Sequence, residues 1–545
     1  MAVLVACERH AAEVGGQLLR AGGSAVDAAI GAAFAQSVVN PLLCGLGGSA
    51  LVLHADLRTG TVTAINGEAA TGSGPVPESW ARRLLGRVET FGRYAVRGEP
   101  NQIGPGAVMV PGFVDAMDAL LAGHGSGRIG LADILSGATR LAREGFTLTP
   151  YLGRWWDAGS AGDSHASRPG YPTLADKMAA QPESAARYLR ADGSGYRAGD
   201  RFAQPWIADI LDHLATAGLP DFLHGSLGGI LAAALDRDGS LITAADVAGY
   251  RAEPAPATTH RIAGTLVHTA PPPSPGLQVL QMLGLAHGLR LAGEPRGPQR
   301  WDRLAAVMRA SFADNRYIKA TRQEDVADTV RAALDADALG AWVERIRGGD
   351  PVRVRGMQPG DGTTHVTAVD EEHAVCITHS AGSVGGSGYL VPELGYLLNN
   401  FLGHYDPRPD NPDSIRPGAR IGTGAPLIAF DGNGFRFAAG APGGSRLVTS
   451  VFQVAHEVLF GGTATDAAVT LPRLHSEQDR TVFVEPALDG AEQLRALGND
   501  VRVSAYMSRV QAIGRDRSGR LVPGADPRGD PGLAHTGRSG VRGSG

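Results

Sequence analysis

Apolar residues recur along this chain with two different spacings, which predicts a mixture of helices and strands. Segments 11–21 and 24–40 have helical spacing, with Gly22-Gly23 as a helix end and Ser24 and Asp27 as the cap of the next helix. Short apolar runs bounded by turn residues predict strands at 50–54 and 266–269. Further helices are expected at 115–122, 131–145, 211–234, 244–250, 277–289, 303–320, 326–347 and 448–459.

One stretch combines strand patterns with a possible nucleophile. Gly360-Asp-Gly362 is followed by Thr363 and Thr364, which open an apolar strand, and a second strand leads into the glycine-rich segment 380–388. A hydroxyl at the start of a strand, next to a flexible segment, is well placed to attack a substrate. The alternative is that both threonines only begin the strand, where threonine is favoured.

Composition narrows the class of protein. The chain has 545 residues, of which 43% are hydrophobic and 19% charged, so it is long enough to bury a large core. The net charge is −5, and lysine and arginine are dispersed rather than grouped in runs. A nucleic-acid or membrane partner is therefore not indicated, and a small-molecule substrate is expected.

Cysteine and histidine positions argue against a disulfide or a metal site. Cys7, Cys44 and Cys376 lie in apolar contexts without paired or metal-type spacing, as buried thiols of a reducing compartment do. The beginning of the chain does not resemble a secretory signal, and no apolar run reaches the roughly 20 residues of a membrane helix. We expect a cytoplasmic protein without a metal or other cofactor. The chain also has no Gly-x-Ser-x-Gly or His-Glu-x-x-His pattern.

Five short motifs in a fixed order resemble the γ-glutamyltranspeptidase family of N-terminal-nucleophile hydrolases. They are Gly22-Gly-Ser-Ala-Val-Asp-Ala-Ala29, Pro271-Pro-Pro-Ser274, Thr363-Thr-His365, Leu397-Leu-Asn-Asn400 and Pro442-Gly-Gly-Ser-Arg446. The resemblance extends from about residue 8 to residue 530. It implies an α+β fold of the four-layer αββα sandwich type. His365 is interpreted as a strand residue rather than a ligand.

The resemblance implies that the precursor cuts its own Gly362–Thr363 bond. A large subunit, 1–362, and a small subunit, 363–545, would then form one intertwined unit. A terminal threonine supplies both the attacking hydroxyl and, in its α-amino group with a pKa of about 7.7–8.0, the base that takes its proton.

The remaining catalytic roles also follow from the resemblance. Ser380 stands where the family has a hydroxyl residue that hydrogen-bonds the nucleophile. The backbone N–H groups of Gly443 and Gly444 would form the oxyanion hole, where glycine lets the backbone approach the reacting oxygen.

The residues that hold a glutamyl group in the family are replaced here. No arginine occurs between Arg58 and Arg82, and Glu68 lies near the position of the family's carboxylate-binding arginine. His404 replaces the acidic residue that holds the α-amino group. Phe401 and Thr423 also replace polar positions. We expect Glu68, Phe401, His404 and Thr423 to bind the substrate, which is then not a γ-glutamyl compound.

Three functions remain open from the sequence. The first is a self-processing hydrolase of a non-glutamyl substrate, with acylases, amidohydrolases and carbon–carbon bond hydrolases of 4-alkyl-proline antibiotic biosynthesis as examples in the family. The second is a conventional γ-glutamyltransferase or glutathione hydrolase. The third is an unprocessed scaffold. The sequence does not determine the identity of the substrate, or whether the scissile bond is an amide or a carbon–carbon bond. It also leaves open whether the reaction is hydrolysis or transfer, and whether the protein forms a homo-oligomer.

Overall fold

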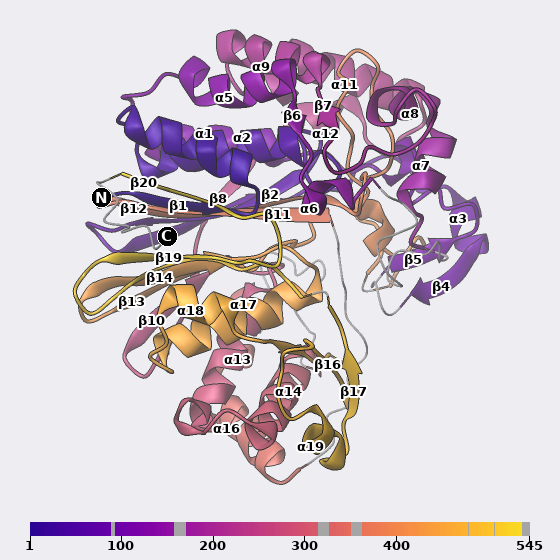
Figure 1. Cartoon of the computed structure of the whole chain (residues 1–545). Coiled ribbons are helices and arrows are strands. Elements are labelled where there is room, and N and C mark those ends of the chain that lie inside the picture. The colour runs from indigo at the N-terminus through magenta and orange to yellow at the C-terminus, as the bar shows by residue number, and fades with distance from the viewer. Residues whose placement is uncertain are drawn as a thin grey trace.

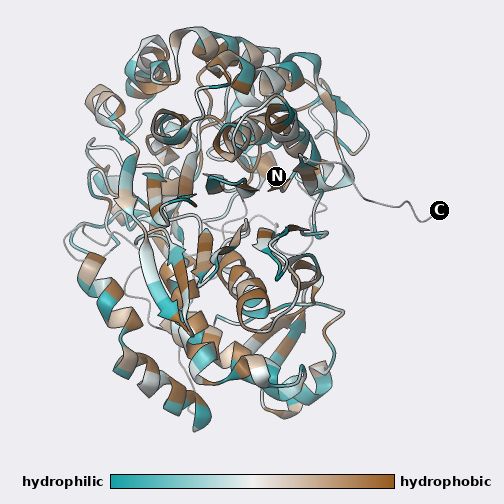
Figure 2. Ribbon diagram, turned by 90° about the vertical axis from the view of Figure 1, so that its left-hand side faces the viewer, coloured by the Kyte–Doolittle hydropathy of each residue, from teal (hydrophilic) through white to brown (hydrophobic). Residues whose placement is uncertain are grey.

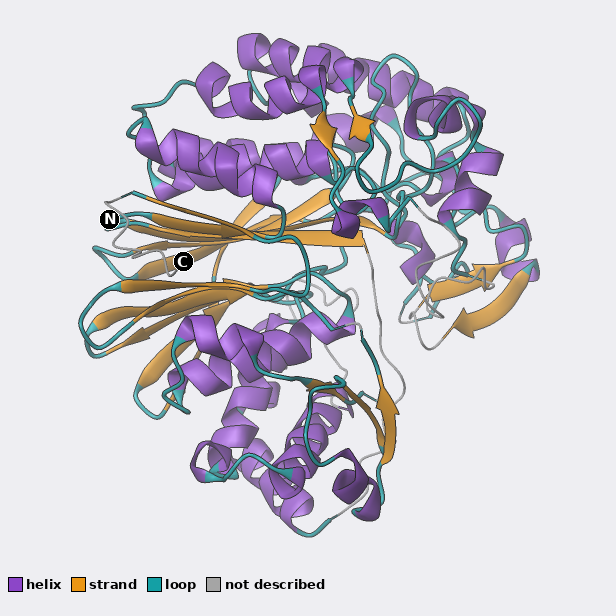
Figure 3. Cartoon of the chain, in the orientation of Figure 1, coloured by secondary structure: helices purple, strands orange, loops and turns teal. Residues whose placement is uncertain are grey.

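Two antiparallel sheets form the centre of the molecule (Figures 1 and 3). The computed structural model describes residues 1–88, 93–156, 170–313, 326–349, 362–411, 413–477, 479–505 and 507–536. The first sheet contains, in spatial order, β20 (Gly532–His535), β1 (Val3–Ala6), β11 (Gly362–Val369), β12 (His373–Gly382), β2 (Ser49–Asp56), β3 (Thr61–Gly67) and β8 (Glu253–Pro256). The second contains β19 (Leu521–Ala525), β18 (Gln511–Arg515), β14 (Gly434–Gly440), β13 (Leu427–Asp431), β10 (Thr265–Thr269) and β9 (Thr258–Ile262).

Helices lie on the outer side of each sheet (Figure 1). On the side of the first sheet are α1 (Arg9–Arg20), α2 (Ala25–Val39), α4 (Phe113–His124), α5 (Leu131–Glu144), α9 (Pro205–Ala217), α10 (Asp221–His224), α11 (Ser226–Arg237) and α12 (Ala244–Gly249). On the side of the second are α13 (Gly276–Gly288), α14 (Pro298–Ala313), α15 (Val326–Leu334), α16 (Ala336–Arg347), α17 (Ser445–Leu459), α18 (Thr465–Thr470) and α19 (Ala491–Ala496). Every residue of α2 is buried, because this helix lies between the sheet and α5.

The strand β12 shows why the central strands are apolar on both faces. Val375 and Ile377 pack into the core shared with the helices above the first sheet. Ala374 and Cys376, which point the other way, pack into the core between the two sheets. Figure 2 shows hydrophobic residues along the strands and on the helices that cover them. A strand buried on both sides reads as a continuous apolar run, as it does in this sequence.

Both sheets combine strands from before and after Gly362. In the first sheet β11 pairs with β1, and β12 pairs with β2. In the second sheet β13 pairs with β10. A cut ahead of Thr363 would therefore leave two fragments held together by the hydrogen bonds of both sheets.

Smaller elements surround this centre. Two-stranded sheets are formed by β4 (Leu84–Val88) with β5 (Arg93–Val96) and by β6 (Phe146–Thr147) with β7 (Arg201–Phe202). A three-stranded sheet contains β15 (Leu474–His475), β16 (Thr481–Val484) and β17 (Asp500–Val503). Short helices are α3 (Glu78–Arg82), α6 (Pro150–Gly153), α7 (Leu174–Ala180) and α8 (Pro182–Tyr188).

The predicted helices agree with the structure where caps are clear. The capping box of Ser24 and Asp27 is present, and α2 begins directly after it. The single helix predicted for 211–234 is wrong, because the chain forms α9, α10 and α11 there. Gly218, with φ of 93°, ends α9, and Pro220 lacks the N–H that a continuous helix needs.

A second helix prediction was also too long. The expected helix 326–347 is divided into α15 and α16, because the Asp335 side chain accepts a hydrogen bond from the Ala338 N–H and starts a new helix. Residues 314–320 of the expected helix 303–320 lie outside the described residues, as does most of the Gly360–Gly362 segment ahead of Thr363.

Candidate active site

The proposed nucleophile and its hydroxyl partner face each other across two adjacent strands. Thr363 lies at the start of β11 opposite Ser380 near the end of β12, next to a register shift between Gly362 and Thr363. The Thr363 Oγ1 donates a hydrogen bond to the Ser380 Oγ over 3.1 Å. Both residues are almost fully buried, at 4% and 2% exposure. The geometry brings together the two hydroxyls that the sequence paired.

A small pocket opens beside this pair. Its volume is about 60 Å³, and its lining residues are Pro275, Thr363, Ser380, Gly382, Phe401, His404, Ile421, Gly422, Thr423, Gly444, Ser445, Leu447 and Val448. None of these described residues is a lysine or an arginine. A substrate carboxylate would therefore meet no lysine or arginine side chain among these residues.

The start of α17 borders the same pocket as Thr363. Gly443 and Gly444 have φ values of 118° and 60°, a region of backbone conformation that favours glycine. The N–H groups of a helix's first turn have no partner inside the helix, and the helix dipole makes this end favourable for negative charge. Gly444 and Ser445 line the pocket, whereas Gly443 does not. Gly444 thus borders the pocket, and the oxyanion role of both glycines stays a prediction.

Two of the residues expected to bind substrate belong to one short 3₁₀ helix, Phe401–His404. Both side chains line the pocket and are buried, at 1% exposure for Phe401 and 5% for His404. Phe401 gives the pocket an apolar wall and His404 adds a polar ring.

Glu68 occupies a different position from the one expected. It is 1% exposed and does not line the pocket, so direct contact with substrate is not what the structure shows. Its carboxyl group lies behind Thr423, whose backbone N–H donates to Oε1 over 2.6 Å and whose Oγ1 lies 2.9 Å from both carboxyl oxygens. Burial raises the pKa of Glu68 to about 7, against the lowering effect of the Thr423 hydrogen bonds.

A buried polar network supports β11 from behind. The Thr364 hydroxyl donates to Glu8 Oε2 over 2.7 Å, and the amides of Gln36 and Asn40 each donate to the Glu8 carboxyl group over 2.8 Å. Glu8 is completely buried. Glu8 is not part of any of the family motifs in the sequence. Its signal was a charged residue directly after a buried apolar strand, a position that needs several hydrogen-bond partners.

The histidines next to the nucleophile have structural roles. His365 lies 2.8 Å from the Thr378 hydroxyl and 2.9 Å from the Thr367 hydroxyl, which confirms its interpretation as a strand residue. His379 Nε2 lies 3.0 Å from the Gln36 side-chain oxygen. Burial lowers the pKa of both histidines to about 3, so they are neutral at pH 7.

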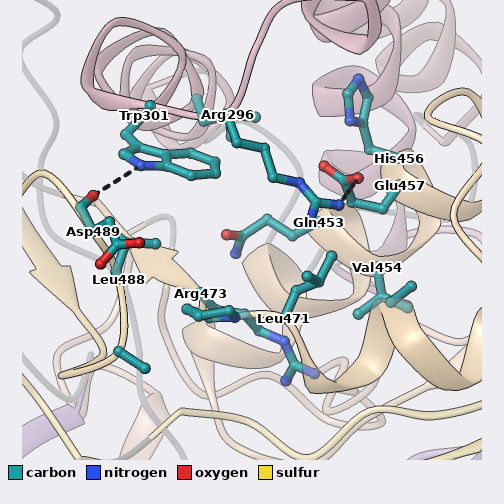
Figure 4. Close-up of a pocket in the computed structure, with 15 residues that line it drawn as sticks. Arg296, Trp301, Gln453, Val454, His456, Glu457, Leu471, Arg473, Leu488 and Asp489 are labelled. Atoms are coloured by element: carbon teal, nitrogen blue, oxygen red, sulfur yellow. Dashed lines mark hydrogen bonds and ion pairs between the residues drawn. The ribbon is translucent and has the colours of Figure 1, made fainter.

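A larger cavity lies further along α17 (Figure 4). Its volume is about 240 Å³, and it is bordered by Trp301, Leu304, Gln453, Val454 and Leu488 among others. At its edge the Arg296 guanidinium donates to Glu457 over 2.7 Å, and the Trp301 indole donates to the Asp489 carbonyl over 3.2 Å. It shares no lining residue with the pocket at Thr363.

The described part of the chain contains no group of three or more histidine, cysteine, aspartate or glutamate side chains arranged to hold a metal ion. Within the same residues, no helix has both the length and the apolar character required to cross a membrane. The three cysteines are free and buried.

Comparison with known proteins decides the family. The sequence pattern of the Gamma-glutamyltranspeptidase family matches residues 11–536. This chain belongs to the γ-glutamyltranspeptidase family. It is therefore a hydrolase of the N-terminal-nucleophile type.

Several curated relatives are precursor proteins. The Acylase ACY 1 proenzyme of Pseudomonas sp. (strain SE83) is 29% identical over 538 residues, which cover 95% of this chain and 91% of the relative. The Glutathione hydrolase proenzyme of Escherichia coli (strain K12) is 24% identical, over 96% of this chain and 90% of the relative.

Solved structures support the mixed fold of this γ-glutamyltranspeptidase family member. A cephalosporin acylase from Bacillus halodurans has a TM-score of 0.82 at 24% identity, covering 98% of this chain and 96% of its own. The structure of LmbA2991T421A has a TM-score of 0.78 at 24% identity, covering 98% of both chains. At this identity the likeness concerns the fold.

The motifs of the family did not reveal the apolar walls of the pocket. Pro275, Ile421, Leu447 and Val448 line it. Pro275 directly precedes α13, whereas Leu447 and Val448 belong to the first turn of α17, so the pocket depends on separate segments of the chain meeting in the fold.

Proposed function

We propose that this chain is a precursor that cuts its own Gly362–Thr363 bond, and that the new terminal Thr363 hydrolyses an acyl compound that is not a γ-glutamyl compound. The proposal extends to the four-layer αββα sandwich of N-terminal-nucleophile hydrolases and to a large and a small subunit. The observation that carries it is the Thr363–Ser380 hydroxyl pair in a pocket bordered by a helix N-terminus and by no lysine or arginine among the described lining residues. The relatives named as proenzymes support the processing step.

The chemistry requires no group beyond this chain and water. The α-amino group of the processed Thr363 takes the hydroxyl proton while Oγ1 attacks the substrate carbonyl carbon. The tetrahedral oxyanion lies against the N-terminus of α17, where Gly444 borders the pocket. The bond to the leaving group breaks, the ammonium group returns the proton to that leaving group, and an ester on Thr363 remains. Water then attacks the ester carbonyl carbon and gives a proton to the same amine. The bond between the acyl carbon and Oγ1 breaks, the ammonium group returns that proton to Oγ1, and the acid is released.

Ser380 orients the Thr363 hydroxyl for its attack on the carbonyl carbon. Its Oγ accepts hydrogen bonds from the Thr363 hydroxyl over 3.1 Å and from the Gly382 N–H over 3.1 Å. The second bond fixes the Ser380 side chain, which in turn orients the nucleophile toward the pocket.

The narrower versions of the proposal differ in the leaving group. An acylase would release an amine, whereas a carbon–carbon bond hydrolase of the 4-alkyl-proline type would release a carbon that takes the returned proton. The likeness to the LmbA2991 structure supports the fold of either version. Analysis of the two products by mass spectrometry distinguishes them.

Denaturing electrophoresis with N-terminal sequencing tests the processing step. We expect two fragments, 1–362 and 363–545, with the second beginning at Thr363. Thr363→Ala should yield one band, and Thr363→Ser, which keeps a hydroxyl, should still be cut. An active protein that stays intact would refute the proposal, and an intact protein without hydrolase activity would favour the unprocessed scaffold.

A chromogenic assay tests the substrate class. Processed protein should release p-nitroaniline from neutral acyl anilides faster than from the γ-glutamyl anilide. Rapid cleavage of the γ-glutamyl compound would instead favour a conventional γ-glutamyltransferase or glutathione hydrolase.

A further inference from the structure

A buried carboxyl group lies directly behind one wall of the pocket. Glu68 follows β3 and is 1% exposed, while Thr423 lines the pocket. The Thr423 N–H donates to Glu68 Oε1 over 2.6 Å, and Thr423 Oγ1 lies 2.9 Å from Oε1 and 2.9 Å from Oε2. Both polar groups of Thr423 are thus directed at one carboxyl group.

The charge of the Glu68 carboxyl group determines whether the Thr423 hydroxyl can donate a hydrogen bond to a substrate or can only accept one. A threonine hydroxyl has one proton and two lone pairs. Beside an ionised Glu68, the proton is donated to the carboxylate and only lone pairs remain for a substrate. Beside a protonated Glu68, the carboxyl group donates to Oγ1 instead and the threonine proton becomes available. Thr423 therefore acts as an acceptor in the first state and as a donor in the second.

The positively charged side chain near Glu68 is Arg420, and its hydrogen bonds are formed with other groups. The Arg420 guanidinium lowers the pKa of Glu68, but it donates to the Asn66 carbonyl and the Arg251 carbonyl, each over 2.6 Å. The other titratable groups close to Glu68 or its neighbours are Asp115, Tyr250, Glu253, His404 and Tyr405. The Tyr250 hydroxyl donates to the Glu68 backbone carbonyl over 2.7 Å rather than to its side chain.

The rest of the pocket is suited to a hydrocarbon group. Phe401, Ile421, Leu447 and Val448 line it, and the described lining residues include no lysine or arginine. A substrate carboxylate near Thr423 would face lone pairs and a buried negative charge, whereas an ammonium or N–H group would donate to Thr423 Oγ1.

We propose that Glu68 sets the specificity of this pocket through Thr423, so that the enzyme takes an acyl group with an apolar chain and an amino or N–H donor at its far end, and rejects a carboxylate there. The inference rests on the proposed function, because it assigns this pocket to the acyl group. Glu68 is a positioning residue, since it reaches the substrate only through Thr423.

Three p-nitroanilides of equal chain length test the preference on processed enzyme: 5-aminopentanoyl, pentanoyl and glutaryl. At pH 8 we expect kcat/KM for the 5-aminopentanoyl compound to exceed that for the glutaryl compound by about tenfold or more. Below pH 7 the ratio should fall, because Glu68 takes up a proton and Thr423 becomes a donor. A ratio near one at pH 8, or a preference for glutaryl, would overturn the inference.

Variants assign the effect to Glu68. In Glu68→Gln the side chain is neutral at every pH, so the ratio should drop about tenfold and lose its pH dependence. Thr423→Ser should keep the preference and Thr423→Val should lose it. Glu253→Gln is the matched control, since this carboxyl group, 55% exposed, bonds the same Arg420 and should leave the ratio unchanged. An unchanged ratio and pH profile in Glu68→Gln refutes the inference.

Binding without turnover separates this inference from the proposed function. Saturation-transfer NMR on the processed protein, with pentylamine and pentanoate as probes at pH 8, should show stronger transfer to the amine, and Glu68→Gln should remove the difference. If no anilide is cleaved but the amine is preferred, the proposed reaction fails while the role of Glu68 stands. Equal transfer to both probes contradicts that role, whatever the enzyme hydrolyses. Fragment pattern and melting temperature confirm that each variant is folded and processed.

Discussion

The pocket at Thr363 and the larger cavity of Figure 4 lie along the same helix, α17, and differ in the part of the helix that they meet. Ser445, Leu447 and Val448 of the first turn border the pocket, whereas Gln453, Val454 and Glu457 of the later turns border the cavity. The first site meets the N-terminal end of the helix, where the helix dipole favours negative charge, and the second meets side chains of the later turns.

The volumes of the pocket and the cavity do not indicate which of them is the active site. The cavity measures about 240 Å³ and the pocket about 60 Å³. None of the described residues around the cavity carries a hydroxyl or thiol group, and Glu457 there is bonded by Arg296 and Arg300. A reactive site depends on an activated nucleophile beside donors for an oxyanion, and the smaller space holds the Thr363–Ser380 hydroxyl pair beside the start of α17, as the proposed function requires.

The difference between the pocket and the cavity is tested most directly by removing one side chain from each. Thr363→Ala should abolish processing and lower kcat by about 10⁴-fold or more, because no other group replaces the hydroxyl and amine of one residue. Trp301→Ala, which removes the large side chain at the cavity, should leave kcat within about twofold. The measurements are electrophoresis and anilide hydrolysis. A comparable loss in Trp301→Ala would show that the cavity belongs to the reaction.

Removing the partner of the nucleophile should have a smaller effect. Ser380→Ala deletes the 3.1 Å hydrogen bond from Thr363, so kcat should fall about 10²-fold with KM little changed. Ser380→Thr keeps a hydroxyl and should recover most of the rate. Full activity in Ser380→Ala would mean that the nucleophile is oriented by its own backbone alone.

At the cavity the largest effect should be on stability. Arg300 is 4% exposed, and Glu457→Ala would leave its charge without this partner. We expect a loss of about 3 kcal/mol in the free energy of unfolding, measured by urea denaturation, with kcat per folded enzyme unchanged. Glu492→Ala removes an exposed ion pair with Arg495 and should cost less than about 0.5 kcal/mol. Equal losses in the two variants would contradict a buried role for Glu457.

Acid should destabilise both regions through histidines that are buried and neutral. Burial lowers the pKa of His365, behind the nucleophile, to about 3 and that of His456, at the cavity, to about 4. Their ordinary pKa is about 6.5, so the unfolded chain binds protons first as the pH falls. The stability they contribute is complete above pH 6.5 and is lost below it, by at most about 1.4 kcal/mol per pH unit for each histidine.

His456→Gln checks the sign of this effect with little cost to catalysis. Urea denaturation between pH 5 and 7.5 should show a shallower fall in stability than the unaltered protein. His535→Gln, at an exposed strand residue, should keep the original slope. Stability that rises on acidification would be incompatible with neutral buried histidines.

Much of the fold and part of the site followed from the sequence. The capping box at Ser24 and the apolar run of β12 depend on short segments whose local pattern is distinctive. The resemblance to the family implied the pairing of Thr363 with Ser380, whose hydroxyls lie 3.1 Å apart. Gly218 and Pro220 also indicate the helix break in the sequence, but the helical spacing of apolar residues on both sides favours one continuous helix. The Gly362–Thr363 cut and the cytoplasmic location stay predictions.

Sequence by itself determined many of the helices and strands, because capping, apolar spacing and glycine conformation act over a few neighbouring residues. The family motifs predict which residues carry the chemistry. Only the tertiary structure decided that Glu68 stands behind Thr423 and that Glu8 supports Thr364, since each pair is joined across more than 350 residues. Burial raises the pKa of Glu68, against the lowering effect of its hydrogen bonds with Thr423, and neither influence acts before the sheets bring these residues together.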